Sequence, residues 1–466
     1  MKSVQNTPPI PHYPKPVSSK ISAFMTLFKK NRSWLNGLYE KSYTMKMGEV
    51  RLPTVTIYLP NEPDLIHRVL VSEAKDFPKN PILHDVLEPL LGESIFTTNG
   101  EVWRRQRELL TPSFEMVRIS KVFDLMLDAA NDMRQRLAAY DPTEYHDLDR
   151  EMTFTTADII FRTILSEKLT EEEGEKIVEA FITYQEESAR LGMLKLFGID
   201  GLVTRIRGDK KRQQSGETIR NALAKIIKPR YEAALQDKPV PSHDILSSLL
   251  KVIDERTGKP FSFKEILDQI AMLFLAGHET TASSLTWTLY LLALHPNIQS
   301  EVHAEIDRVC TTEQLTAEQV KSLHLTTNVF NEALRLYPPV SFMPRIAAKT
   351  TVIRNKTIKP GDAVMVSPWL MHRNSRYWED PHRFDPYRFD HPEKITKYTY
   401  FPFGLGPRIC IGARFAMQEA PILLSTILKE YRLELKPGFI PDVAGRLTTR
   451  SLNGMPIRLI PRGDKR

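Results

Sequence analysis

The chain lacks several features that define common classes of protein. Only two of its 466 residues are cysteines, Cys310 and Cys410, which is too few for a disulfide scaffold, a four-cysteine zinc site or an iron–sulfur cluster. No continuous apolar segment has the form of a secretory signal or a membrane span, and the N-terminus is proline-rich instead. These absences predict a cytoplasmic protein in which any special cysteine acts alone.

Charge of one sign is also not concentrated anywhere in the chain. The formal net charge is +7, but 64 basic residues are scattered among 57 acidic ones, without a dense basic run, an internal repeat or a low-complexity segment. This pattern favours an acidic partner surface or a buried anionic group, and it argues against a nucleic-acid partner.

The periodicity of apolar residues predicts a mainly α fold with a small, discontinuous β portion. The clearest helix begins with Ser262 and Glu265 in capping-box spacing and runs to His295, where Pro296 ends it. Its roughly 32 residues would span on the order of 48 Å, enough to cross a domain. Strand-like pieces are "TVTIYL", "KTIKPGDAVMVSP" and "LTTRSLNGMPIRLI". We expect an N-terminal arm with a first amphipathic helix over 1–40, and a single domain over 41–466.

The long helix contains a polar interruption, "FLAGHETTASS". Ala276 and Gly277 remove side-chain volume, and Glu279 and Thr280 place an acid and a hydroxyl on a helix expected to be buried. Residues that are unfavourable in a buried helix suggest a functional site when they interrupt a core element. Packing through small residues, with Glu279 reaching solvent, explains them equally well. The H-E-x-x-H zinc motif is excluded because position 282 is Ala.

Two other helices carry spaced polar pairs. Glu332 and Arg335 lie three residues apart and form an ion pair that is commonly a surface feature. Trp103 and Arg107 lie four apart, so both could donate to one anion, or Trp103 could pack in the core while Arg107 faces water.

The stretch "FPFGLGPRICIG" is either a phosphate-binding loop or a mount for the Cys410 thiol. A dinucleotide loop needs glycine at position 409, which is Ile, and a β-α-β unit that does not follow. The stretch leads instead into the amphipathic helix "ARFAMQEAPILLSTILKEY", whose N-terminus would stabilise a thiolate. A hydrolytic cysteine stays open, but the glycines, Phe403 and Arg408 suit a flat, anionic, iron-bearing partner better.

Taken together, the motifs resemble the cytochrome P-450 superfamily of haem-thiolate monooxygenases, over about Tyr58 to Leu459. "FGLGPRICIG" is similar to the haem-binding loop, "AGHETT" to the oxygen-activating helix, "EALR" to the E-x-x-R pair and "FDPYRF" to the P-x-R-F element, in the family's order. The resemblance implies haem b, with Cys410 as the axial ligand of the iron and Glu279 with Thr280 as the catalytic proton relay. It further implies a haem-binding set of Trp103, Arg107, Ala276, Arg345, Phe403, Gly406, Arg408, Cys410 and Gly412.

The resemblance also implies a structural cluster in which Arg388 shares the carboxylate of Glu332 with Arg335. The substrate pocket would be formed by Phe96, Ala276, Val340, Phe342 and Leu452, all apolar, for a lipophilic substrate such as a fatty acid, alkane, terpenoid or steroid. Tyr58 and Arg51 are available to anchor a carboxylate near the first strand, although "TVTIYL" itself contains no base.

The implied activity is insertion of one oxygen atom from O2, as hydroxylation or epoxidation, in a monomer. Electrons would come from a separate ferredoxin or flavodoxin with its NAD(P)H reductase, with Arg408 and Arg414 as candidate contacts. A peroxide-driven peroxygenase or isomerase and a non-catalytic sensor are the alternatives, and the Glu279–Thr280 pair argues against both. Segments 20–32 and 192–208 could touch a membrane surface, but packing against the body is favoured.

Overall fold

A computed structural model describes residues 9–27, 33–52, 55–115, 122–196, 207–236, 238, 244–312 and 314–463. The helices are α1 Lys20–Leu27, α2 Pro63–His67, α3 Pro81–Leu91, α4 Gly100–Leu110, α6 Phe123–Ala138, α7 Leu148–Ile160, α8 Glu171–Leu196, α9 Arg207–Leu235, α10 Ile245–Leu250, α11 Phe263–Leu294, α12 Pro296–Val309, α13 Ala317–Lys321, α14 His324–Leu336, α15 Pro368–Met371 and α16 Ala413–Glu430. The strands are β1 Met47–Arg51, β2 Thr56–Pro60, β3 His146–Asp147, β4 Ile253–Asp254, β5 Lys259–Pro260, β6 Met343–Ile346, β7 Thr351–Ile353, β8 Lys356–Ile358, β9 Ala363–Val366, β10 Tyr431–Leu435, β11 Val443–Gly445, β12 Thr449–Ser451 and β13 Pro456–Pro461.

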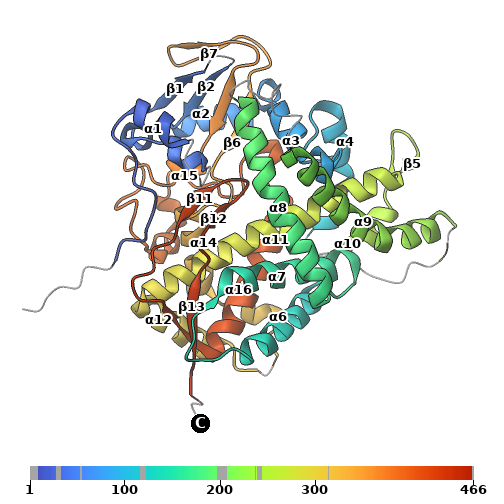
Figure 1. Ribbon diagram of the computed structural model, residues 1–466, viewed down its shortest axis with the longest axis vertical. Coiled ribbons are helices and arrows are strands. Elements are labelled where there is room, and N and C mark those ends of the chain that lie inside the picture. Colours follow the sequence, from blue (N-terminus) through green and yellow to red (C-terminus); the bar gives the residue numbers. More distant parts are fainter. Residues whose placement is uncertain are drawn as a thin grey trace, which may run out of the picture.

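The helix α11 organises the molecule, as the sequence predicts. It is 32 residues long, and the Ser262 hydroxyl and the Glu265 carboxylate cap its N-terminus reciprocally. Nearly all of its residues are buried, and it crosses the molecule in contact with α7, α9, α14 and α16 (Figure 1). A helix that is apolar on almost every side is stable only when other helices surround it.

The sheets are small and separate, which confirms the predicted fold class. The largest has the order β1-β2-β9-β6, in which β2 and β9 are parallel and the other pairs antiparallel. A second sheet has the order β10-β13-β3, and β11 pairs with β12 as a hairpin. These sheets lie mainly at one side of the helical body (Figure 1). The Ser283 hydroxyl and the Trp287 indole of α11 donate to the Thr449 carbonyl of the β11–β12 hairpin, and residues of β6 line the cavity described below.

The N-terminal arm packs onto this body. The His12 backbone N–H donates to the Tyr290 hydroxyl at 3.2 Å, and the Pro9 carbonyl lies 2.9 Å from Nε2 of His295. The boundary expected near residue 40 stays a prediction. In the two candidate membrane segments, α1 covers Lys20–Leu27 and α8 extends to Leu196, while residues 28–32 and 197–206 lie outside the described residues. Across the described helices, none is long and apolar enough to cross a membrane.

Candidate functional site

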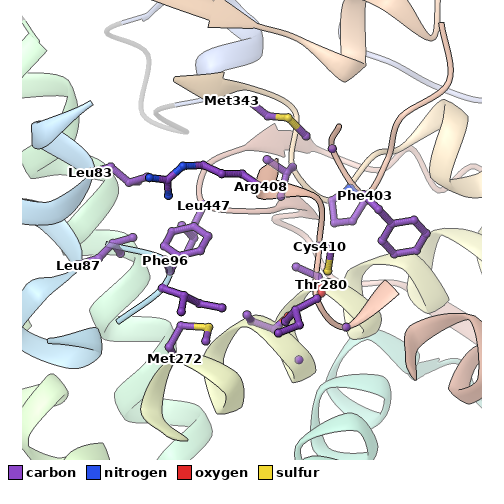
Figure 2. A pocket seen from close by; sticks show the side chains of 18 of the residues that line it. Leu83, Leu87, Phe96, Met272, Thr280, Met343, Phe403, Arg408, Cys410 and Leu447 are labelled. Carbon is purple, nitrogen blue, oxygen red and sulfur yellow. The ribbon is translucent and has the colours of Figure 1, made fainter. Parts of the chain in front are cut away.

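A cavity of about 420 Å³ lies between α11 and the loop that carries Cys410. In Figure 2, the Cys410 sulfur and the Thr280 side chain lie on one side of the view, and Phe96, Leu87 and Met272 lie on the other. The predicted residues Ala276, Val340 and Phe342 also line it. The fold therefore brings together the Cys410 thiol, the Thr280 hydroxyl and a mainly apolar surface.

The cysteine loop is shaped by close backbone contacts. The Cys410 N–H donates to the Phe403 carbonyl at 2.9 Å, and a short 3-10 turn, Gly406–Arg408, precedes it. Gly406 has φ +69°, and a Cβ there would lie 2.1 Å from the Leu70 carbonyl oxygen. Only glycine fits this position, as the sequence predicts.

The Cys410 thiol is accessible from the cavity, but the surrounding protein separates it from bulk solvent. Burial raises the pKa of the thiol, while the Gly412 N–H and the Arg107 guanidinium oppose that rise. The loop ends at Gly412, which is the N-cap of α16. Because burial outweighs these two contacts, the thiol keeps its proton until a metal centre replaces it, so Cys410 is suited to bind such a centre.

Three cations form a group on the cavity wall, which we call the cation group: Lys79, Arg345 and Arg408. The Lys79 Nζ donates to the Phe96 carbonyl at 2.6 Å, and Arg408 donates to Oδ1 of Asn99 at 2.7 Å. Burial lowers the pKa of Lys79 well below its usual value, and the charges of Arg345 and Arg408 lower it further. Burial alone lowers the pKa of Arg345 to about 10, and burial together with Arg345 lowers the pKa of Arg408 to about 10.

No carboxylate balances the cation group. Within the described part of the chain, the residues that line the cavity include Arg107 and Arg446 in addition to the cation group, but no Asp or Glu. Buried cations without an anion are unstable unless a ligand supplies one. The two propionates of haem b meet that need, so the residues present fit this cofactor.

The indole and guanidinium from α4 lie beside the same wall. Trp103 lines the cavity and lies under the Arg408 guanidinium, 4.3 Å from ring centre to Cζ. Arg107 donates to the Ile409 carbonyl at 2.9 Å, which fixes the residue before Cys410. Both side chains thus lie at the cavity, as the family resemblance implies, and the alternative in which they are split between core and solvent is wrong.

The two proposed proton-relay residues, Thr280 and Glu279, lie in different surroundings on α11. The Thr280 hydroxyl lines the cavity and donates to the Ala276 carbonyl at 2.6 Å. The Glu279 carboxylate is buried against the β11–β12 hairpin, where Arg450 donates to it at 2.6 and 3.0 Å and the Thr448 hydroxyl also donates. Burial would raise the pKa of Glu279, but Arg450 lowers it below its usual value. The carboxylate is therefore ionised and held away from Thr280, and the alternative in which it reaches solvent is excluded by its 2% exposure.

The acid–arginine cluster, defined as Glu332, Arg335 and Arg388, lies outside the cavity. Arg335 donates to both carboxylate oxygens of Glu332 at 2.6 and 2.7 Å, and both side chains are fully buried. The Arg388 Nε lies 3.4 Å from the same carboxylate, and Arg335 also donates to three backbone carbonyls. These contacts are those expected from the sequence.

Three expectations from the sequence are wrong in position. Leu452 does not line the cavity and is 37% exposed, because it lies at the open end of the β11–β12 hairpin, opposite Asp442. The turn at the other end places Leu447 in the cavity instead (Figure 2). Tyr58 is buried and donates to the Thr357 carbonyl, and neither it nor Arg51 lines the cavity. Arg408 faces inward, so of the two candidate partner contacts only Arg414 lies on the surface.

Two cations were missed by sequence reasoning. Lys79 stands alone in "DFPKNP" before α3, and Arg446 stands in a hairpin turn. Neither belongs to a motif with helical or strand spacing, and each becomes significant only when the fold brings it to the cavity.

The comparisons with known proteins agree with this site. The family model described as "Cytochrome P450" matches residues 9–453. The chain is 31% identical to cyclooctatin synthase of Streptomyces melanosporofaciens over 416 residues, covering 89% of this chain and 88% of the relative. It is 30% identical to cyclooctat-9-en-7-ol 5-monooxygenase of the same organism, covering 84% and 83%. Leukotriene-B4 omega-hydroxylase 3 of Mus musculus is 27% identical, covering 93% and 85%. A cysteine loop facing a long helix across an apolar cavity, together with these matches, establishes that the chain belongs to the cytochrome P450 family.

Proposed function

We propose that this chain uses Cys410 as the haem ligand and the Thr280 side of α11 as the oxygen-activating wall of a haem-thiolate monooxygenase. Membership of the family establishes the cofactor, haem b, and the reaction class. The observation that carries the residue assignment is that the Cys410 thiol and the Thr280 hydroxyl face one cavity whose buried cations lack a protein anion.

The overall reaction fixes what the residues must do. One atom of O2 enters a C–H bond of a lipophilic substrate, and the other leaves as water after two electrons and two protons have been supplied. Epoxidation of a C=C bond has the same electron and proton balance. Haem b, when bound, supplies the iron at which O2 is reduced.

The protein residues bind the cofactor and control its surroundings. Cys410 would donate its thiolate, and the Gly412 N–H would moderate the charge on the sulfur. The cation group would hold the two propionates, with Trp103 beneath Arg408 and Arg107 fixing the loop carbonyl. The Phe403 carbonyl accepts the Cys410 N–H, and the Phe403 side chain lines the cavity. This ring would exclude water from the sulfur.

Proton delivery would divide between Thr280 and Glu279. The Thr280 hydroxyl faces the cavity and can pass a proton to a group bound there. Glu279 is held by Arg450, which is also within 2.5 Å of Asp149, a side chain that is 21% exposed. The Glu279 carboxylate would take up a proton and pass it on only after it leaves Arg450. The ion pair would therefore limit how often a proton reaches Thr280.

We favour a separate ferredoxin or flavodoxin with its reductase, a monomeric enzyme and a cytoplasmic location. The exposed Arg414 beside the cysteine loop supports an acidic partner surface.

Turnover in ¹⁸O2 tests this function. The holoenzyme, a surrogate ferredoxin and reductase, and NADPH are expected to give a product that carries one ¹⁸O atom. Thr280→Ala is expected to consume NADPH with less product and more hydrogen peroxide, because proton delivery is misdirected. Product oxygen derived from water, or product formed only with added peroxide, would contradict the proposal.

A further inference from the structure

One face of α7 lies against the polar interruption of α11. Four residues of α7 are spaced four, three and four apart, which places them in one stripe of an α-helix: Asp149, Thr153, Thr156 and Ile160. We call these four residues the α7 stripe. α7 packs along α11, and each member of the stripe contacts α11, the Arg450 guanidinium or both. The α7 stripe thus borders the segment of α11 that carries Glu279 and Thr280.

The N-terminal half of the α7 stripe holds the arginine that binds Glu279. One terminal nitrogen of Arg450 donates to Asp149 at 2.5 Å and to the Thr153 hydroxyl at 3.1 Å. The other two nitrogens of this guanidinium donate to Glu279. The Thr286 hydroxyl of α11 also donates to Asp149, at 3.0 Å. The position of the Glu279 carboxylate therefore depends on α7 as well as on the β11–β12 hairpin.

Thr156, in the C-terminal half of the α7 stripe, binds the backbone of α11. Its hydroxyl lies 3.0 Å from the His278 carbonyl oxygen of α11 and 2.8 Å from the Met152 carbonyl oxygen of its own helix. The single hydroxyl proton is therefore shared between the backbones of the two helices. The Thr156 side chain is fully buried, so water does not compete for this contact.

Ile160 holds α11 one residue earlier, by packing. It lies where Gly277 has no side chain, because a Cβ at position 277 would be 2.4 Å from the Ile160 Cδ1. The glycine thus allows α7 to approach α11 closely. Together with Thr156, this contact holds residues 277 and 278 directly before the two relay residues.

This segment of α11 needs support because its own side chains donate to its backbone. The Thr280 hydroxyl donates to the Ala276 carbonyl at 2.6 Å, and the Ser284 hydroxyl donates to the Thr280 carbonyl at 2.8 Å. Hydroxyls that donate to carbonyls four residues earlier weaken a helix slightly and often bend it. A segment weakened in this way keeps one orientation when a neighbouring helix holds it.

We propose that Thr156 is a positioning residue for oxygen activation. Its hydroxyl holds the His278 carbonyl, so that α11 presents Thr280 to the cavity and Glu279 to Arg450. Thr156 does not line the cavity and therefore acts through these residues. This inference rests on the proposed monooxygenase function and adds a residue of α7 to its proton delivery.

Three variants of the haem-loaded protein test this role. Thr156→Val removes the hydroxyl and keeps the shape of the side chain, whereas Thr156→Ser keeps the hydroxyl. Thr163→Val is the matched control, because the equally buried Thr163 hydroxyl donates to the Ile159 carbonyl of its own segment at 2.7 Å instead of to α11.

Turnover is measured with a surrogate ferredoxin and reductase, NADPH and styrene as the lipophilic probe. Thr156→Val is expected to release about 5-fold more hydrogen peroxide per NADPH, the fold-change of one neutral hydrogen bond, with the KM for styrene unchanged. Thr156→Ser and Thr163→Val are expected to behave as the wild type. The low-spin ferric EPR spectrum, recorded without partner or probe, should broaden in Thr156→Val alone, because α11 then takes more than one orientation beside the haem.

A peroxide yield and an EPR spectrum of Thr156→Val that match the wild type would overturn the inference. Equal changes in Thr156→Val and Thr163→Val, the same defect in Thr156→Ser, or no holoprotein from Thr156→Val would overturn it too, since each indicates a role in the fold alone. The reduced carbon monoxide spectrum of the wild type separates these failures from failure of the proposed function. A normal thiolate-type band with no effect of Thr156→Val rejects the positioning role alone, whereas absence of the band rejects the haem-thiolate assignment itself.

Discussion

The acid–arginine cluster and the cation group are both buried and charged, but only one is complete within the protein. Glu332 receives two hydrogen bonds from Arg335 and lies near Arg388, and Arg335 also satisfies three carbonyl oxygens. In the cation group, burial lowers the pKa of all three side chains, Arg345 and Arg408 lower that of Lys79 further, and Arg345 lowers that of Arg408. A saturated buried charge stabilises a fold, and an unbalanced one indicates a ligand of opposite charge.

Breaking the complete cluster should have the largest effect. Glu332→Ala leaves the fully buried Arg335 without its carboxylate, and removal of one partner of a buried ion pair costs about 3–5 kcal/mol. We expect little folded protein and almost no retained haem, measured by far-UV circular dichroism and by the ratio of Soret to protein absorbance. A normal yield of holoenzyme would contradict the structural role.

Removing one member of the cation group should act on the cofactor instead. Arg345→Gln takes away one buried guanidinium, so repulsion on Lys79 falls and the fold is retained. Haem should dissociate about 10-fold faster, as expected for one lost charge-assisted hydrogen bond. Transfer of haem to excess apomyoglobin measures the rate. Loss of folded protein comparable with that of Glu332→Ala would show that the two regions do not differ in the way described.

A third buried ionisable group, Glu419, sharpens the comparison through pH. It lies in α16, neither of its carboxyl oxygens has a hydrogen-bond partner within normal geometry, and burial raises its pKa from 4.5 to about 8 although the nearby Thr281 lowers it. The folded state therefore keeps a proton that the unfolded chain loses above about pH 4.5, so stability should fall as pH rises from about 4.5 to about 8.

Glu419→Gln should remove this contribution. Urea midpoints of the variant should vary less with pH than those of the wild type, and the variant should be the more stable protein near pH 8. Parallel midpoint curves for the two proteins would show that Glu419 is already ionised and paired in the folded state.

An exposed pair should give the smallest effect. Arg134 lies 3.2 Å from Glu430, with side chains 49% and 35% exposed. Arg134→Gln should lower the free energy of unfolding by less than about 1 kcal/mol, because water replaces the contact. If the free energy of unfolding fell as much as in Glu332→Ala, burial would not explain why the two ion pairs differ.

The sequence predicted those features that depend on local pattern. The capping box at Ser262, the long helix and the E-x-x-R pair are all encoded within a few residues, so their geometry follows from spacing. The side of α11 to which Glu279 turns was not predictable, because it depends on Arg450 from a hairpin 171 residues away.

The sequence also could not predict which single residues in turns line the cavity. Lys79 and Arg446 lie outside any periodic pattern, and Leu452 was chosen in place of Leu447 because the register of β11 with β12 cannot be read from composition. Register decides which end of a hairpin reaches a site, and it is fixed by tertiary contacts such as that of Gly445 with Ser33.

The assignment of Cys410 as the ligand of haem iron is the central claim, and the carbon monoxide difference spectrum of the reduced protein tests it most directly. The wild type should show the red-shifted Soret band of a thiolate-bound haem, and Cys410→His should bind haem but show the band of an imidazole ligand. Cys310→Ser, which changes the other, buried cysteine, should leave the red-shifted band intact. Absence of that band from the haem-loaded wild type, or its persistence in Cys410→His, would contradict the account.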